Sequence, residues 1–338
     1  MKTIILAQPG RLDLVETAQA GPLAGEALVK VHRIGVCGTD IHAFGGKQPF
    51  FSYPRILGHE LGVEVIAVGE GVSVVGAGDR CAVEPYLNCG QCIACRQGKA
   101  NCCVRMQVLG VHVDGGMREY FSVPADKLHV SRKLTFDQLA LVEPLGIGAH
   151  AVERAQVSAG EHVLVIGAGP IGLAVMQFAV EKGAKVTVLD INAKRLEFCR
   201  DLIGVTNAID GTREDVAIAL SRITGGDGPT VVFDATGNEG SMKRAFDYPA
   251  HGGRLVFVGL YQGDVTFNDP NFHRRELTLM GSRNALAADF QRIIELIEAG
   301  RIDTNPWITH RVAFDQVVVD FPAWTDPATG VIKAVIEV

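Results

Sequence analysis

Closely spaced thiols are the first feature of this sequence that could do chemistry. One short stretch carries Cys89, Cys92, Cys95 and Cys103, separated by two, two and seven residues. Four sulfur ligands complete a tetrahedral zinc shell and leave no position open to a substrate. The spacing therefore predicts a structural zinc site, with Cys102 as an alternative to Cys103. A nucleic-acid-binding zinc ribbon would need a basic surface, and the basic residues of this stretch are too few.

A second set of metal-ligand types is spread over three separate segments. Cys37 opens the motif CGTDIH, His59 and Glu60 follow a glycine, and Glu143 stands in the motif VEPL. One thiolate, one imidazole and one carboxylate can hold zinc and leave a position open for a substrate. Sequence spacing alone does not join Glu143 to Cys37, and an isolated histidine is more often a core residue.

A glycine-rich turn provides a candidate phosphate site. Residues 167–172 read GAGPIG and lie between an apolar run and an apolar helical pattern. The spacing GxGxxG is weak by itself, but in a strand–turn–helix unit it permits a tight turn, close approach of a pyrophosphate and helix–strand packing. The expected dinucleotide-binding residues are Gly167, Gly169, Pro170, Ile171 and Gly172.

Two charged residues further along bear on the choice of dinucleotide. Asp190 ends the next predicted strand, eighteen residues after Gly172. A carboxylate there accepts hydrogen bonds from the ribose hydroxyls of NAD and repels the 2′-phosphate of NADP. Its alternative role is to cap the helix that follows. Arg195 either contacts the adenosine side or is a solvated helix cation. We expect NAD.

The elements that must position these groups change in character along the chain. Residues 1–145 contain short apolar runs broken by glycine, which predicts an antiparallel β domain. From residue 161 strands alternate with helical patterns, which predicts a doubly wound parallel sheet. A helix is predicted over 287–299, and the last strand, within 330–338, is expected to return to the first domain.

Composition excludes some classes of function. The formal net charge of −6 gives no electrostatic case for binding nucleic acid. Residues 163–180 carry no charge, but their glycines and proline would break a membrane-spanning helix, so a strand, a turn and a helix are expected there. The first residues do not resemble a secretory signal, and the clustered thiols suit a reducing compartment. We therefore expect a cytoplasmic protein without a membrane span.

The motifs CGTDIH, GHE, the four-cysteine stretch, VEPL and GAGPIG occur in an order that resembles the zinc-containing medium-chain alcohol dehydrogenases. The resemblance covers essentially the whole chain. It implies an α/β fold with a Rossmann doubly wound parallel sheet plus a GroES-like β-barrel catalytic domain. The implied bounds are 1–147 for the catalytic domain with its structural zinc lobe, 148–284 for the NAD-binding domain, and 285–338 for the return to the catalytic domain.

The resemblance also implies cofactors and roles. It implies two zinc ions per subunit and NAD. Ligands of the catalytic zinc correspond to Cys37, His59 and Glu143, and Glu60 binds that zinc directly or through water. Thr39 and His42 correspond to a proton relay, so that a zinc-bound alcohol loses a proton and then a hydride. Further cofactor contacts are expected at Val258, Gly259, Leu260 and Ser282. One departure is Val63, which stands where the family usually has glycine, while Gly62 precedes it.

Finer resemblance bears on the substrate. The segments GGKQPFFSYPRILGHE, LGVHVDGGMREY and DPNFHRRELTLMGSRNA resemble the branch that oxidises sugar acids such as L-galactonate. A sugar acid needs hydroxyl partners and a cation for its carboxylate. Candidate substrate contacts are Phe50, His273, Arg283 and Asn284, with Phe51 and Tyr53 beside them; each could be structural instead.

Other functions and the state of assembly stay open. Oxidation of L-threonine or of sorbitol also suits CGTDIH and GHE. A nonenzymatic, zinc-stabilised NAD-binding protein is an interpretation of another class, against which the retained Cys37, His59 and Glu143 argue. The resemblance implies a homodimer or homotetramer, and strand 254–260 is the expected edge strand for pairing between subunits.

Overall fold

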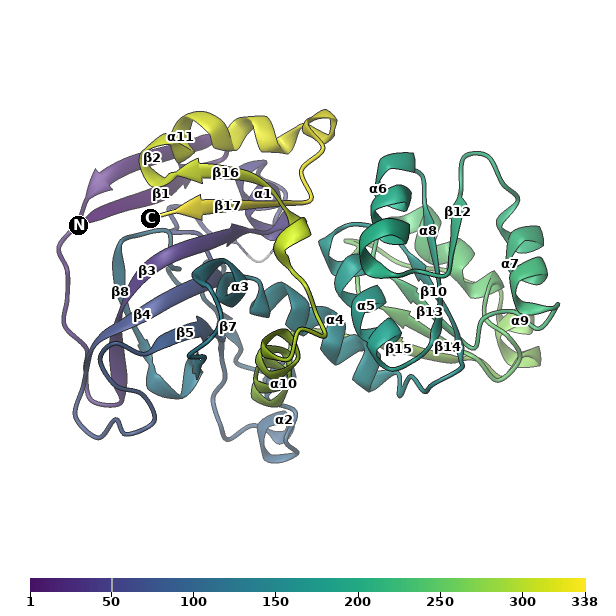
Figure 1. Cartoon of the computed structure of the whole chain (residues 1–338), viewed down its shortest axis with the longest axis horizontal. Helices are drawn as coiled ribbons and strands as arrows, with labels where there is room; N and C mark the ends of the chain where they lie inside the picture. The colour runs from purple at the N-terminus through teal and green to yellow at the C-terminus, as the bar shows by residue number, and fades with distance from the viewer. Residues whose placement is uncertain (50) are drawn as a thin grey trace. The chain divides into compact units, whose positions relative to one another are not determined.

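The computed structural model describes residues 1–49 and 51–338. It divides the chain into two compact units (Figure 1): residues 1–144 together with 285–338 form the first, and residues 145–284 form the second. The expected bound at 147 lies three residues after this division, and the bound at 284/285 coincides with it.

A seven-stranded sheet dominates the first unit. Its strands run in the order β16-β17-β3-β4-β5-β9, with β8 paired to β3. Their bounds are β3 Glu26–Val36, β4 Glu60–Val68, β5 Arg80–Val83, β8 Tyr120–Pro124, β9 Leu128–Val130, β16 Ile308–Ala313 and β17 Lys333–Glu337. All pairs are antiparallel except β16 with β17. The antiparallel β domain is confirmed, and so is the return of the last strand to it.

Two small ladders and several helices complete the first unit. The ladders pair β1 (Lys2–Gln8) with β2 (Arg11–Glu16), and β6 (Tyr86–Leu87) with β7 (Gln107–Val108). The helices are α1 Gly38–Phe44, α2 Ile93–Arg96, α3 Phe136–Ala140, α10 Ala287–Glu298 and α11 Val317–Asp320. Helix α10 matches the expected helix over 287–299.

Strand β4 gives a physical reason for the departure at Val63. Val63 is fully buried in the apolar core of the sheet, opposite Val31 and Cys81. At Gly62 a Cβ atom would lie 2.2 Å from the carbonyl oxygen of Phe136, which no side chain tolerates. The close approach of α3 to β4 therefore requires glycine at position 62 and leaves room for valine at position 63.

The second unit is built on an all-parallel sheet of six strands. The order is β12-β11-β10-β13-β14-β15. The bounds are β10 His162–Ile166, β11 Lys185–Asp190, β12 Asn207–Asp210, β13 Val231–Asp234, β14 Arg254–Phe257 and β15 Thr278–Gly281. This is the doubly wound order with a switch point beside β10, where such sheets bind dinucleotides. The Rossmann prediction is confirmed.

Helices pack against this sheet (Figure 1). They are α5 Pro170–Glu181, α6 Ala193–Phe198, α7 Val216–Thr224, α8 Glu239–Arg244 and α9 Asp269–Arg274, while α4 (Val142–Arg154) spans the division between the units. The uncharged stretch 163–180 forms β10, the turn and most of α5. Within the described residues no helix is long and apolar enough to cross a membrane.

The expected edge strand is wrong. Strand β14, within 254–260, lies between β13 and β15, so the edges of the parallel sheet are β12 and β15. The continuous apolar run RLVFVGL is typical of a central parallel strand with both faces covered, which is where β14 lies. The edge strand β15 has mostly exposed side chains.

Candidate active site

The segment 88–106, between β6 and β7, contains the four cysteines of the predicted structural zinc site, and we call it the four-cysteine lobe. The sulfur atoms of Cys89, Cys92, Cys95 and Cys103 all lie within 4.8 Å of one another. Backbone N–H groups point at these sulfurs: those of Cys89 and Arg105 both donate to Cys103 Sγ at 3.3 Å. Cys102 is exposed and lies outside the group.

Backbone N–H groups favour the thiolate form at two cysteines of the lobe. A backbone N–H from Gln91 lowers the pKa of Cys89 to about 6, and the backbone N–H of Cys95 lowers the pKa of Cys92. Burial raises the pKa of Cys95 instead. Four sulfur donors at this spacing fit a closed tetrahedral zinc shell. In contrast, burial raises the pKa of both Cys81 and Cys199 to about 12, as expected for core thiols.

A second metal-ligand group forms where α1 begins and β4 begins. Ligand atoms of Cys37, His59 and Glu60 lie within 4.8 Å of one another, and His59 and Glu60 are buried. Cys37 is the N-cap residue of α1, and its backbone N–H donates to the carboxylate of Asp40 at 2.9 Å. One thiolate, one imidazole and one carboxylate at this distance suit a zinc ion with an open position.

Buried atoms without hydrogen-bond partners mark this second group as a cation site. Oδ1 of Asp40 and Nδ1 of His59 are both unpartnered and lie 3.7 Å apart. Burial alone would lower the pKa of His59, but Asp40, Cys37 and Glu143 together raise it well above its ordinary value. Three groups that can carry a negative charge therefore lie near this one imidazole, which favours a bound cation. A ligating imidazole whose second nitrogen faces a carboxylate is the usual arrangement of a histidine on zinc.

Lys333 is a site residue that the sequence analysis missed. Its Nζ donates to both carboxylate oxygens of Glu60 at 2.7 Å and to the carbonyl of Val36 at 3.2 Å. Both partners of the ion pair are about 1% exposed. Burial alone would lower the pKa of Lys333, but Glu60 raises it. The available signal was a lysine between two apolar runs, in the sequence GVIKAVI.

Tyr86 is a second missed residue. Its hydroxyl donates to Oε1 of Glu143, which stands buried in the first turn of α4. Burial raises the pKa of both groups, and the charge of Glu143 further raises that of Tyr86, so Tyr86 keeps its proton. Glu143 is outside the group of three ligand atoms but close enough to raise the pKa of His59.

Helix α1 carries Thr39 and His42, the two residues of the expected proton relay. Thr39 is half-buried one turn before His42, and His42 is exposed in the last turn. Residues three apart on a helix lie on one face, so Thr39 and His42 share a face of α1.

Close packing shapes the glycine turn at the carboxyl end of β10. Gly167 has a φ of +99°, and a Cβ at Gly172 would lie 1.8 Å from the carbonyl oxygen of Gly167. Gly169 is the N-cap of α5, with Pro170 and Ile171 opening the helix. The N-terminus of this twelve-residue helix is a suitable place for a phosphate.

Asp190 is part of the same turn. One carboxylate oxygen accepts from the backbone N–H of Ala168 at 2.6 Å, and the other accepts from that of Asn192 at 2.8 Å. Asn192, not Asp190, caps α6, which also carries Arg195. The carboxylate is therefore fixed at the end of β11, beside the glycine turn, where a ribose would reach it.

The loops that follow β13 and β14 pack against each other at the carboxyl ends of these strands, where the glycine turn also lies. The fully buried Asp234 accepts from the hydroxyls of Thr236 at 2.6 Å and Ser241 at 2.5 Å. A Cβ at Gly259 would lie 2.3 Å from the backbone nitrogen of Gly237. Of the other expected cofactor contacts, Val258 and Gly259 follow β14, Leu260 is exposed beside them, and Ser282 follows β15 with a buried, unpartnered hydroxyl. Asp234 ends β13 as Asp190 ends β11, and its hydrogen bonds hold the loop that follows β13.

Comparison with known proteins agrees with this geometry. Residues 170–299 match the family "Zinc-binding dehydrogenase", and residues 23–133 match "Alcohol dehydrogenase GroES-like domain". The L-galactonate-5-dehydrogenase of Escherichia coli (strain K12) is 43% identical over 93% of this chain and 92% of its own length. The chain belongs to the zinc-binding alcohol dehydrogenases. The 2-dehydro-3-deoxy-L-galactonate 5-dehydrogenase of Pseudoalteromonas atlantica is 34% identical over 88% of the chain and 87% of its own length.

A solved structure extends the likeness to the whole fold of the dehydrogenase. The alcohol dehydrogenase rspB of E. coli CFT073, complexed with NADH, superposes with a TM-score of 0.93 at 32% identity. The match covers all of this chain and 99% of that one. The zinc dehydrogenase fold and the family's reaction class, oxidation of an alcohol with a nicotinamide cofactor, therefore apply to this chain.

Among the candidate substrate residues of the second unit, His273 lies away from Arg283 and Asn284. Arg283 and Asn284 follow the carboxyl end of β15, the edge that carries the glycine turn. His273 is in α9, before β15 begins, and so lies at the opposite end of that strand. Tyr53 donates to the carbonyl of Ala43 at 2.5 Å, and Phe51 packs edge-on against it. Phe50 lies outside the described residues.

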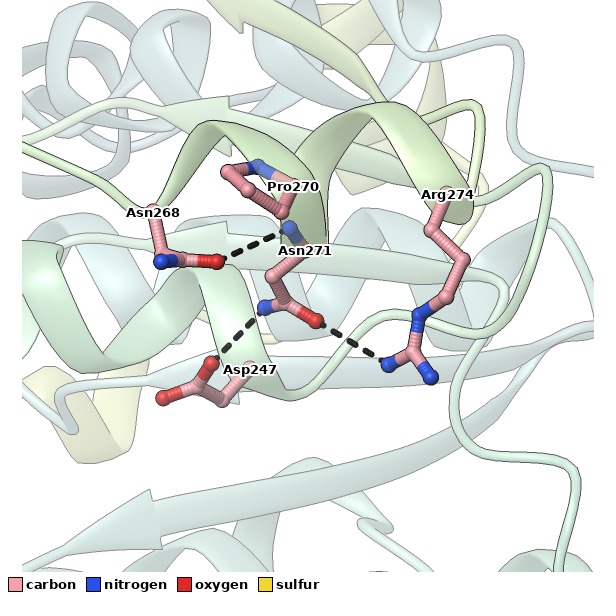
Figure 2. A pocket seen from close by; sticks show the side chains of 5 residues that line it. All are labelled: Asp247, Asn268, Pro270, Asn271 and Arg274. Atoms are coloured by element: carbon pink, nitrogen blue, oxygen red, sulfur yellow. Dashed lines mark hydrogen bonds between the residues drawn. The ribbon is translucent and has the colours of Figure 1, made fainter.

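A shallow cavity lies next to α9 (Figure 2). It has a volume of about 420 Å³ and is lined by Asp247, Asn268, Pro270, Asn271 and Arg274. Figure 2 shows Asn271 at its centre, donating to Asp247 at 2.9 Å and accepting from Arg274 at 3.5 Å. Because its polar groups already bind one another, and α9 precedes β15, we assign it no part in the dehydrogenase reaction.

Proposed function

We propose that this dehydrogenase uses zinc and NAD to oxidise a secondary hydroxyl of a sugar acid, such as L-galactonate, to a ketone. The observation that carries the proposal is the buried group of Cys37, His59 and Glu60 in a chain that is 43% identical to an L-galactonate-5-dehydrogenase over 93% of its length. The fixed carboxylate of Asp190 supports NAD rather than NADP.

The residues around the candidate catalytic zinc site would have separate roles in this reaction. When bound, zinc supplies Lewis acidity and NAD accepts a hydride. Cys37 and His59 would hold the metal together with a carboxylate from Glu60 or Glu143. Thr39 would accept the proton of the substrate hydroxyl and pass it toward the exposed His42, which exchanges it with water. The four-cysteine lobe would hold a second zinc without chemistry of its own.

Two further proposals concern the oligomeric state of the enzyme and its location in the cell. We propose a homodimer or homotetramer, since the parallel sheet leaves β15 as an edge strand within the described chain. We also propose a cytoplasmic location. All eight cysteines are free in the structure, and clustered free thiols suit a reducing compartment.

A substrate panel tests the main proposal. Zinc-replete protein is assayed for NADH formation with L-galactonate, galactitol, sorbitol and L-threonine at equal concentrations. We expect kcat/KM to be highest for L-galactonate. A preference for sorbitol or L-threonine would keep the mechanism and reject the sugar acid, and NAD binding without turnover of any alcohol would favour a nonenzymatic protein.

Arg283 is the cation that we propose for the carboxylate of the substrate. The variant Arg283→Gln should raise KM for L-galactonate about tenfold, because a charge-assisted hydrogen bond is lost, and leave KM for neutral galactitol nearly unchanged. Arg274→Gln is the matched control, since Arg274 is an exposed arginine before β15. Equal effects of Arg283→Gln on both substrates would remove Arg283 from this role.

A further inference from the structure

The lobe and the candidate active site meet at one short ladder. Strand β6 (Tyr86–Leu87) pairs with β7 (Gln107–Val108), with Tyr86 opposite Val108 and Leu87 opposite Gln107. All four lobe cysteines lie on the segment 88–106 between these strands. The ladder therefore closes the base of the lobe, and any metal that holds the lobe together also holds β6 in place.

Tyr86 carries that constraint to Glu143. It is 3% exposed, and its hydroxyl donates to Oε1 of Glu143. Its ring packs edge-on against Phe290, with centroids 6.3 Å apart and planes at 77°. Tyr86 is held at its backbone, its ring and its hydroxyl, so its hydroxyl can in turn hold the carboxylate of Glu143.

Buried polar groups tie the flanks of Tyr86 to the lobe. Two residues before it, Glu84 binds Lys127 Nζ at 2.6 Å and His129 Nε2 at 3.1 Å. Two residues after it, Asn88 accepts from Lys127 at 2.9 Å and donates to Cys95 Sγ at 3.8 Å. His129 also stacks on Phe290 with centroids 4.8 Å apart. A cysteine of the lobe and the aromatic support of Tyr86 therefore belong to one connected, mostly buried cluster.

We propose that Tyr86 is a positioning residue that couples the two metal sites: the filled lobe fixes Tyr86, and Tyr86 fixes Glu143 beside the group of Cys37, His59 and Glu60. This rests on the proposed function, which supplies a metal at both sites. Outer hydrogen bonds of this kind commonly change metal affinity by about 10- to 100-fold. The lobe thus sets the geometry of the active site as well as the stability of its own loop.

The test reads the active-site metal directly. Full-length wild type, Tyr86→Phe and Tyr261→Phe are prepared with zinc in the lobe and Co²⁺ in the site of Cys37, with metal content measured by mass spectrometry. Visible absorption bands of Co²⁺ report its ligand geometry, and competition with a chelator gives its affinity. Tyr261→Phe is the matched control, because the Tyr261 hydroxyl donates to Glu239 at 2.9 Å in the other unit.

We expect Tyr86→Phe to shift the Co²⁺ bands and weaken Co²⁺ binding about tenfold, and Tyr261→Phe to change neither. As a single substitution, Cys92→Ser removes one ligand of the lobe and should shift the same Co²⁺ bands. Added to Tyr86→Phe, it should produce no further shift. If Tyr86→Phe lowers only the thermal stability and leaves bands and affinity as in wild type, Tyr86 is merely structural and the proposal is overturned. Should Cys92→Ser fail to fold, Tyr86→Phe decides alone.

The two possible failures are distinguishable. Wild type that takes up no metal beyond the lobe overturns both this proposal and the proposed function. Wild type that binds Co²⁺ and oxidises its substrate, with Tyr86→Phe spectroscopically identical to it, overturns only the coupling.

Discussion

The carboxylate of Asp190 has two expected roles. A matched control variant distinguishes them from a general effect on the fold. It holds the glycine turn through the backbone of Ala168 and Asn192, and we expect it to bind the ribose of NAD. Asp190→Ser should lower the preference for NAD over NADP about tenfold or more, because both the charge-assisted hydrogen bonds and the repulsion of a 2′-phosphate are lost. Steady-state kinetics with each cofactor measure the ratio.

Asp210→Ser is the control for this prediction. Asp210 ends the neighbouring strand β12 and lies opposite Asp190 in the parallel register, but its carboxylate binds Thr212 instead of the glycine turn. An unchanged cofactor ratio in Asp190→Ser, or an equal change in Asp210→Ser, would show that Asp190 does not recognise the ribose.

The ion pair between Lys333 and Glu60 makes a prediction about stability. Lys333→Met should leave a carboxylate buried without its cation, which costs about 3–5 kcal/mol of unfolding free energy. Urea unfolding measures this in protein with no metal at Cys37, His59 and Glu60, so that no other cation neutralises Glu60. Lys2→Met breaks the exposed pair between Lys2 and Asp315, at 2.6 Å, and should leave the unfolding free energy nearly unchanged. Comparable losses in the two variants would contradict the importance assigned to burial.

At the scale of elements, the close contact between α3 and β4 depends on the absence of a side chain at Gly62. Gly62→Ala should lower the unfolding free energy by about 1–3 kcal/mol, because its Cβ would overlap the carbonyl oxygen of Phe136 in α3. Differential scanning calorimetry measures the effect. Gly21→Ala is the control, since a Cβ there meets nothing within 4 Å. If Gly62→Ala unfolds at the wild-type temperature, α3 can move away from β4 at no cost.

Sequence patterns predicted those elements whose signals are local. The glycine turn, the cysteine spacing and the alternation of strands and helices each lie within a short window, and the fold class and family follow from them. Lys333 and Glu60 are 273 residues apart, and Tyr86 and Glu143 are 57 apart, so no pattern near either residue identifies its partner. Only the return of β17 to β3 and the start of α4 bring these pairs together.

The wrong prediction that β14 is an edge strand has a related cause. The apolar run of β14 reports that both faces of the strand are covered, but it does not report which strands lie on either side. His273 shows the same limit, since it is close in sequence to Arg283 but separated from it by the length of β15. Neighbours in space along a parallel sheet depend on topology, which a linear pattern does not contain.

At the scale of the whole molecule, β15 is one of the two edge strands of the parallel sheet and the one that we propose for pairing with a second copy. The N–H groups of Thr278 and Ser282 donate to the carbonyls of Gly253, just before β14, and Phe257, at its end. The alternation of the strand therefore directs the N–H groups of Leu279 and Gly281 away from β14. A short edge strand with outward N–H groups and a 40% exposed leucine can pair with the same strand of another subunit.

Leu279→Lys tests this mode of assembly. Around a twofold axis the substitution would place two like charges in one interface, so we expect the dissociation constant of the dimer to rise about tenfold or more. Light scattering over a dilution series measures it, together with thermal unfolding to verify that each chain stays folded. Leu14→Lys is the matched control, because Leu14 is also 40% exposed but lies on β2 in the other unit. If both variants assemble as wild type does, β15 is not the interface, and the subunits associate through another surface.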